Sequence, residues 1–261
     1  LGYGAVGAAL GTATAILITM CGMMHALVAR DRHLRFSLDS RQRFKPHRDT
    51  LSNVLRIGTP ISLEKGVMSG AQVAISGIIA PMGSTAIAAN TFGINIESLC
   101  YMPGYGVGEA ATTLVGQSMG ARRSDLMRSF AWISMAFGML IMIFMGIIMW
   151  VFAPEMMRVV TTDAAVVSLG TDILRIEAWA EPWFAASIVA YGIFVGAGKT
   201  LGSSVLNLVS IWGVRLTLAL ALAPTMGLHG VWIAMAIELT FRGIAFIIKL
   251  TGRGWTKNGC R

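Results

Sequence analysis

The residues of this sequence that are most able to do chemistry are glutamates inside long apolar stretches. Glu177 and Glu181 stand one helical turn apart in the segment RIEAWAEPWF, directly before Pro182. Two like charges at this spacing destabilise a helix, so we expect the pair to have a function. By rise per residue, Glu181 lies roughly 22 Å into a helix that starts near Val166, close to the middle of a bilayer. Such a pair can exchange a proton for a cation, and we expect it to line a transport path.

Pro182 is expected to bend the helix that carries this pair. A proline inside a helix removes one backbone hydrogen bond, and its ring crowds the preceding turn. We therefore predict a kink at Pro182 that opens a cavity or acts as a hinge.

Three further glutamates occupy apolar stretches. Glu238 is followed four residues later by Arg242, which predicts a structural ion pair on one helix face. Glu64 precedes Lys65, but adjacent helical residues do not face each other. Glu97 has no basic residue within one turn. Its charge must therefore be balanced by a residue of another helix, by water or by a proton. We predict that the acids that bind the substrate or the coupling ion are Glu64, Glu97, Glu177 and Glu181.

Two arginines near these acids are assigned structural roles. Asp172 stands three residues before Arg175, and we expect these two side chains to pair. Arg215 lies in another apolar stretch and is interpreted as a counter-ion for the acids.

The apolar stretches themselves predict an all-α, polytopic membrane helix bundle. Of the 261 residues, 55% are hydrophobic and only 13% are charged, which is too apolar for a soluble domain of this size. A membrane-spanning helix needs about 20 apolar residues. Seven stretches are long enough, and we predict seven transmembrane helices near residues 1–29, 57–79, 86–115, 130–152, 166–195, 201–223 and 227–250.

The basic residues indicate membrane topology and not nucleic-acid binding. They account for the net charge of +8 and gather in every second loop, beginning with residues 30–50. Basic loops of membrane proteins remain in the cytoplasm. We therefore predict a multi-pass protein of the plasma (inner) membrane with a cytoplasmic C-terminus, and the lipid bilayer as a partner.

The sequence predicts neither an enzyme nor a metalloprotein. The four histidines stand at expected helix ends or in loops, and the three cysteines are too scattered for a zinc site. We expect no metal and no cofactor.

A similarity between two segments of the sequence predicts that the chain is the second part of a protein built from two repeats. GAVGAALGTA from Gly4 and GLHGVWIAMA from Gly227 share a Gly-x-x-Gly at a helix start. We expect residues 1–29 to be the last helix of an N-terminal lobe and residues 30–50 to be a cytoplasmic inter-lobe loop. Residues 51–251 would form a six-helix C-terminal lobe, and residues 252–261 a cytoplasmic tail.

Three segments resemble the multidrug and toxic compound extrusion (MATE) family: IGTPISLEKG, IESLCYMPGYGVGEAATTLVGQSMGARR and IEAWAEPWFAASIVAYGIFVGAGKT. The resemblance implies a secondary antiporter of twelve helices in two six-helix lobes, working by alternating access. Family members export cationic, often aromatic compounds in exchange for protons or sodium ions. The chain would then be the second half of such a transporter, with the missing N-terminal lobe as its partner.

The acids of this chain depart from the sodium-coupled branch of that family. The branch has an acid eight residues after the proline of its seventh helix, where this chain has Met68, and an aspartate where it has Phe184. Glu64 and Glu181 each stand one turn earlier. The displacement favours protons over sodium ions without excluding either.

Two alternatives remain open. A lipid-linked oligosaccharide flippase of the same superfamily would handle an anionic pyrophosphate, whereas the deep charges here are mainly acids. The chain could also be an inactive half-transporter, because one lobe cannot form the cleft between two.

Overall fold

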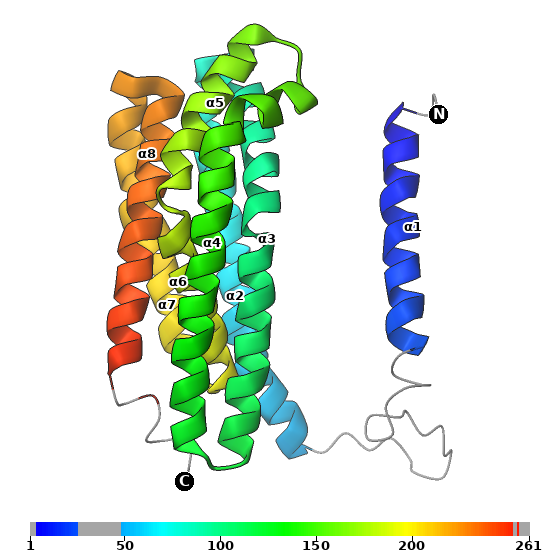
Figure 1. Cartoon of the computed structure of the whole chain (residues 1–261), viewed down its shortest axis with the longest axis vertical. Coiled ribbons are helices and arrows are strands. Elements are labelled where there is room, and N and C mark those ends of the chain that lie inside the picture. The colour runs from blue at the N-terminus through cyan, green and yellow to red at the C-terminus, as the bar shows by residue number, and fades with distance from the viewer. Residues whose placement is uncertain (1–3, 26–47, 253–254, 256–261) are drawn as a thin grey trace. The chain divides into compact units, whose positions relative to one another are not determined.

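The computed structural model describes residues 4–25, 48–252 and 255, and these residues form two units. The first unit contains helix α1 (Gly4–His25), an apolar helix of 22 residues. The second unit begins at Leu51 and contains the other helices, apart from the first three residues of the helix that starts at Arg48; each unit is treated by itself. The described residues include helices and no strand, which confirms the all-α fold (Figure 1).

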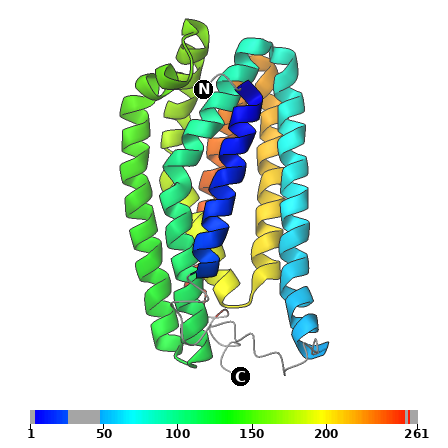
Figure 2. The ribbon, with the colours of Figure 1, turned by 90° about the vertical axis from the view of Figure 1, so that its right-hand side faces the viewer.

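The second unit is a bundle of long helices that pack side by side (Figures 1 and 2). Its elements in chain order are α2 (Arg48–Ile79), the 3-10 turn η2 (Ala80–Met82), α3 (Ser84–Gly120), α4 (Ser124–Val160), α5 (Ala164–Ala178), α6 (Glu181–Gly196), α7 (Thr200–Val209), the π-helix η3 (Ser210–Arg215) and α8 (Leu216–Thr251).

The last two predicted spans form one helical run that turns back on itself. Gly227 has φ +59° and ψ −138°, which interrupts α8. A Cβ on Gly230 would lie 2.6 Å from the carbonyl oxygen of Leu222, so the two parts of α8 touch closely beside this turn. Figure 2 shows the chain rising through α7 and descending again after the turn. Both glycines are therefore needed for the reversal.

Length and hydropathy identify fewer spans than the sequence analysis predicted. Among the described residues, α4 and the run Thr200–Thr251 are long and apolar enough to cross a membrane. The pair α5 and α6 makes a third span if it is counted as one. The run Thr200–Thr251 contains two passes because of the reversal at Gly227, and the bundle also contains α2 and α3.

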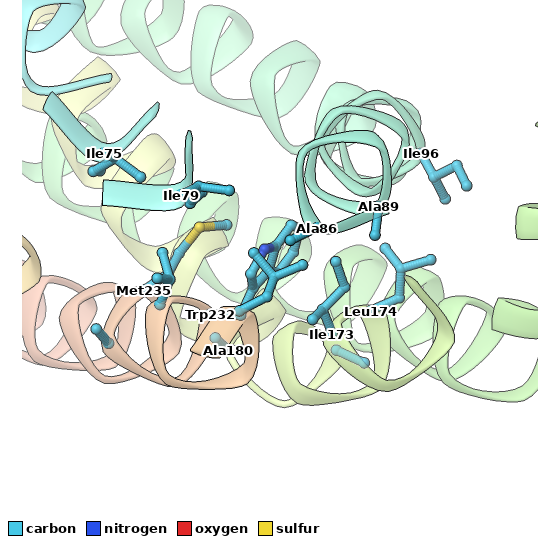
Figure 3. Packing of buried hydrophobic residues seen from close by; sticks show 14 of the residues in the cluster. Ile75, Ile79, Ala86, Ala89, Ile96, Ile173, Leu174, Ala180, Trp232 and Met235 are labelled. Atoms are coloured by element: carbon cyan, nitrogen blue, oxygen red, sulfur yellow. The ribbon is translucent and has the colours of Figure 1, made fainter. Parts of the chain in front are cut away.

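One of the two apolar cores lies around Trp232 of α8 (Figure 3). Its indole is 1% exposed and packs near Ala86 and Ile173. The indole N–H donates to Asn90 Oδ1 at 3.1 Å, so the polar atom of this buried ring is satisfied.

Small residues set the spacing between α3 and α6. A Cβ on Gly192 would overlap the carbonyl oxygen of Gly108 and lie 2.8 Å from Thr112 Oγ1. The hydroxyl of Thr112 donates to the carbonyl oxygen of Gly192 at 2.9 Å, which is a hydrogen bond between the two helices. Such close backbone approach is typical of helix packing in membranes.

We expect Gly192→Ala to destabilise the bundle by about 1–3 kcal/mol, because the added methyl must push α3 away from α6. Thermal unfolding in detergent measures the effect. The matched control is Gly106→Ala in α3, since a Cβ there meets nothing within 4 Å. Equal unfolding midpoints for the two variants would contradict this account of the α3–α6 contact.

Candidate functional site

The predicted fifth span is broken between its two glutamates. Glu177 lies in the last turn of α5, Glu181 is the first residue of α6, and the two helices meet at 58°. The two acids therefore belong to different helices and do not stand one turn apart in a single helix, as their spacing had predicted. Pro182 stands in the first turn of α6. The N–H groups of a first turn have no partner within the helix, so a proline there costs no hydrogen bond. The bend lies just before Pro182, and a hinge motion there stays a prediction.

The break brings both carboxylates into the interior. Glu177 and Glu181 are each 0% exposed, and none of their carboxylate oxygens has a hydrogen-bond partner among the described residues. Gly146 of α4 permits this arrangement, since a Cβ there would lie 2.9 Å from the carbonyl oxygen of Ala178 and 3.3 Å from Glu181 Cβ.

Glu97 and Arg215 join this pair from two other elements. Glu97 of α3 is 4% exposed and interacts electrostatically with both Glu177 and Glu181. Arg215 ends the π-helix η3 and interacts with Glu97, Glu177 and Glu238. Single π-helical turns occur at functional positions of longer helices. Among the described residues Arg215 Nε has no hydrogen-bond partner and the guanidinium contacts Met235, so the counter-ion role of Arg215 stays a prediction.

The predicted pair of Glu238 and Arg242 is present. Arg242 Nε lies 3.2 Å from Glu238 Oε1, and both side chains are buried. The N–H is not aligned for a hydrogen bond, so the contact is an ion pair. Ser210 Oγ donates to the same carboxylate oxygen at 2.5 Å. Glu238 therefore has partners at Oε1, whereas its Oε2 has no hydrogen-bond partner among the described residues; Glu177 and Glu181 have no partner at either oxygen.

The expected pair of Asp172 and Arg175 does not form. Asp172 Oδ2 lies 3.4 Å from His229 Nε2 of α8. Arg175 Nε donates to the carbonyl oxygen of Trp150 at 3.4 Å, and its guanidinium stands 5.5 Å from the centre of the Trp150 ring. Contacts between helices have replaced the local pair in both cases.

Glu64 of α2 has two partners that are distant in sequence. Its Oε2 accepts from the hydroxyl of Tyr191 at 2.9 Å, and its Oε1 accepts from Asn207 Nδ2 at 2.6 Å. The sequence analysis missed Tyr191 and Asn207. The amide within the predicted span 201–223 was the available signal for Asn207.

Glu64 lines a cavity of about 270 Å³ among α2, α3, α6, α7 and α8. The walls carry three aromatic rings, two acids and two bases, from Tyr105, Phe184, Tyr191, Glu64, Glu109, Lys65 and Arg242. Aromatic faces and carboxylates together suit an organic cation.

The buried charges do not balance within the bundle. Five buried carboxylates face two buried guanidinium groups, which leaves a formal excess of three negative charges; the acids are Glu64, Glu97, Glu177, Glu181 and Glu238, and the bases are Arg215 and Arg242. A buried carboxylate without a partner is costly unless a proton or a cation neutralises it. In the part of the chain that the structure describes, no three His, Cys, Asp or Glu side chains gather as metal ligands.

Comparison with known proteins identifies relatives that match most of the chain. The MatE family model matches residues 60–221. The probable multidrug resistance protein NorM of Thermotoga maritima is 28% identical over 214 residues, which is 81% of this chain and 46% of that protein. The NorM protein of Idiomarina loihiensis is 28% identical over 254 residues, covering 94% of this chain and 54% of the relative. The chain thus spans about half the length of the curated relatives it matches.

Solved structures share the fold. A MOP superfamily transporter from Pyrococcus furiosus, described as having a binding pocket of reverse polarity, superposes with a TM-score of 0.84 at 22% identity. A multidrug resistance MATE family transporter in an outward-facing conformation superposes with a TM-score of 0.83 at 24% identity. Each comparison covers 96% of this chain and 56% of the solved one.

Proposed function

The chain belongs to the MatE family of membrane transporters, which are not enzymes, and we propose that it is the second half of a secondary antiporter. The full-length protein would export cationic drugs or other toxic organic cations in exchange for protons, with sodium ions as the alternative. The observation that carries this proposal is the pair Glu177 and Glu181, buried and without partners at a helix break.

In this proposal the acids that bind the substrate differ from those that bind the coupling ion. The cavity around Glu64 receives the organic cation, because three aromatic rings and two acids line it, beside two bases. Glu97, Glu177 and Glu181 take up the coupling ion, since their negative charge exceeds that of the arginines nearby. Arrival of the coupling ion lowers the attraction for the substrate, and one lobe then moves against the other.

The domain organisation and topology belong to the same proposal. Residues 1–29 are the last helix of an N-terminal lobe, 30–50 the inter-lobe loop, 51–251 the C-terminal lobe and 252–261 the tail. The alternating basic loops support a multi-pass protein of the inner membrane with a cytoplasmic C-terminus. Its partners are small organic cations, the bilayer and the N-terminal lobe, and the coupling ion takes the place of a cofactor.

The test is reconstitution of the full-length protein in liposomes loaded with a fluorescent cation. We expect an acidic exterior to accelerate efflux, because protons then enter as the cation leaves. A sodium gradient imposed at constant pH identifies the other coupling ion. If neither gradient changes efflux, antiport is ruled out.

Two further samples separate the alternatives. We expect the 261-residue chain alone to transport nothing, because the cleft needs both lobes. A flippase would instead translocate a lipid-linked oligosaccharide pyrophosphate in the same liposomes, and we expect none.

A further inference from the structure

Two cavities lie end to end along the groove between α4 and α5. An apolar cavity of about 410 Å³ is lined by Ile143, Ile147, Trp150, Trp179 and Pro182 among others. A polar cavity of about 640 Å³ is lined by Arg158, Thr161, Asp172 and Arg175 among others. Arg175 connects the two, because it contacts Trp150 on the wall of the apolar cavity.

The groove crosses the expected boundary of the hydrocarbon region. Residues 130–152 of α4 carry no charge, and Trp132 and Trp150 stand near the two ends of this stretch. Their separation of 18 residues corresponds to about 27 Å of helix, close to the thickness of a bilayer core. Tryptophans of membrane proteins concentrate at the two interfaces. Trp150 therefore marks one interface, with the apolar cavity on its hydrocarbon side and the polar cavity beyond it.

Two arginines line the polar cavity, and among the described residues Arg175 is the one without an acidic partner. Asp172 contacts His229, and Arg158 lies 3.7 Å from Glu155. No ion pair of Arg175 occurs among the described residues, where its contacts are the carbonyl oxygen and ring of Trp150. A guanidinium at this depth is suited to bind a phosphate through charge-assisted hydrogen bonds.

We propose that this groove binds one glycerophospholipid, with its phosphate at Arg175 and an acyl chain in the apolar cavity. The arrangement matches an amphiphile with an anionic group at the interface and a hydrocarbon chain below it. Trp179 and Ile147, which are 76% and 58% exposed, present apolar surface to such a chain. Gly146 lies in the cavity wall and also packs against Ala178 and Glu181, so the lipid would abut the break that holds this acid.

Native mass spectrometry of the full-length protein in detergent with added phosphatidylethanolamine tests the proposal without measuring transport. We expect one phospholipid to remain bound to the wild type. The Arg175→Gln variant should bind it about tenfold more weakly, because the charge-assisted contact is lost. The Ile147→Trp variant should also lose the lipid, because the larger ring fills the acyl cavity. Arg128→Gln, at the opposite end of α4, is the matched control and should bind as the wild type does.

Two competitors identify the ligand. Diacylglycerol with the same acyl chains lacks the phosphate and should not be retained. Soluble glycerophosphoethanolamine lacks the chains and should not displace the lipid. Equal retention by the wild type and Arg175→Gln, retention of diacylglycerol, or displacement by the soluble headgroup would each overturn the proposal. Elution of every variant at the wild-type volume in size-exclusion chromatography shows that the fold is kept.

Discussion

The Glu181→Gln variant of the full-length protein is expected to lose export of organic cations while its expression stays at the wild-type level. Glutamine has nearly the same shape as glutamate but can neither take up a proton nor hold a cation. Glu181 makes no hydrogen bond among the described residues, so the change breaks no contact. We therefore expect the free energy of unfolding to change by less than about 1.5 kcal/mol, as for other isosteric changes in a core.

Drug resistance of cells that carry the variant, together with efflux from liposomes, measures this effect. Glu155→Gln is the matched control. The Glu155 carboxylate is exposed at the end of α4, where it lies 3.7 Å from Arg158. The control should export as the wild type does. Unchanged efflux by Glu181→Gln would remove this residue from the mechanism.

The same reasoning predicts that Glu177 and Glu181 act as a unit. The two side chains interact electrostatically in one buried volume. Residues that act together have non-additive effects. The double glutamine variant should therefore be no more impaired than either single variant.

The Arg242→Met variant is expected to lose about 3–5 kcal/mol of stability, because it leaves the buried carboxylate of Glu238 without its cation. Glu238 is 0% exposed and would retain the hydrogen bond from Ser210 and the longer-range attraction of Arg215. Methionine keeps much of the volume of the arginine stem, so the cost arises chiefly from the charge. Thermal or denaturant unfolding in detergent measures it.

A second substitution isolates that cause. Adding Glu238→Gln to Arg242→Met removes the unpaired charge and should restore most of the lost stability. Part of the loss should persist, since the Arg242 guanidinium also stands 5.7 Å from the centre of the Phe184 ring. Arg158→Met is the control, because its exposed ion pair is worth at most about 1 kcal/mol. A double variant as unstable as Arg242→Met would show that the charge of Glu238 is not responsible.

Local patterns in the sequence determined the helices and one ion pair. Long apolar stretches predict helices in a membrane because the backbone must satisfy its own hydrogen bonds there. The spacing of Glu238 and Arg242 predicts their contact because residues four apart share one helix face. The rarity of charge in these stretches also singled out the acids that the structure places inside the bundle.

The tertiary structure alone decided which groups meet. The partners of Glu64 are 127 and 143 residues away, and Asn90 meets the Trp232 indole from 142 residues away. Pro182 indicated a bend. The position of the bend, at residues 179–180, depends on the close approach of Gly146 to Ala178. Asp172 contacts His229 and Arg175 contacts Trp150, so these two side chains do not pair with each other. A local pair is worth only a few tenths of a kcal/mol, and contacts between packed helices can replace it. Periodicity carries information about one helix, whereas these contacts arise from how several helices share an interior.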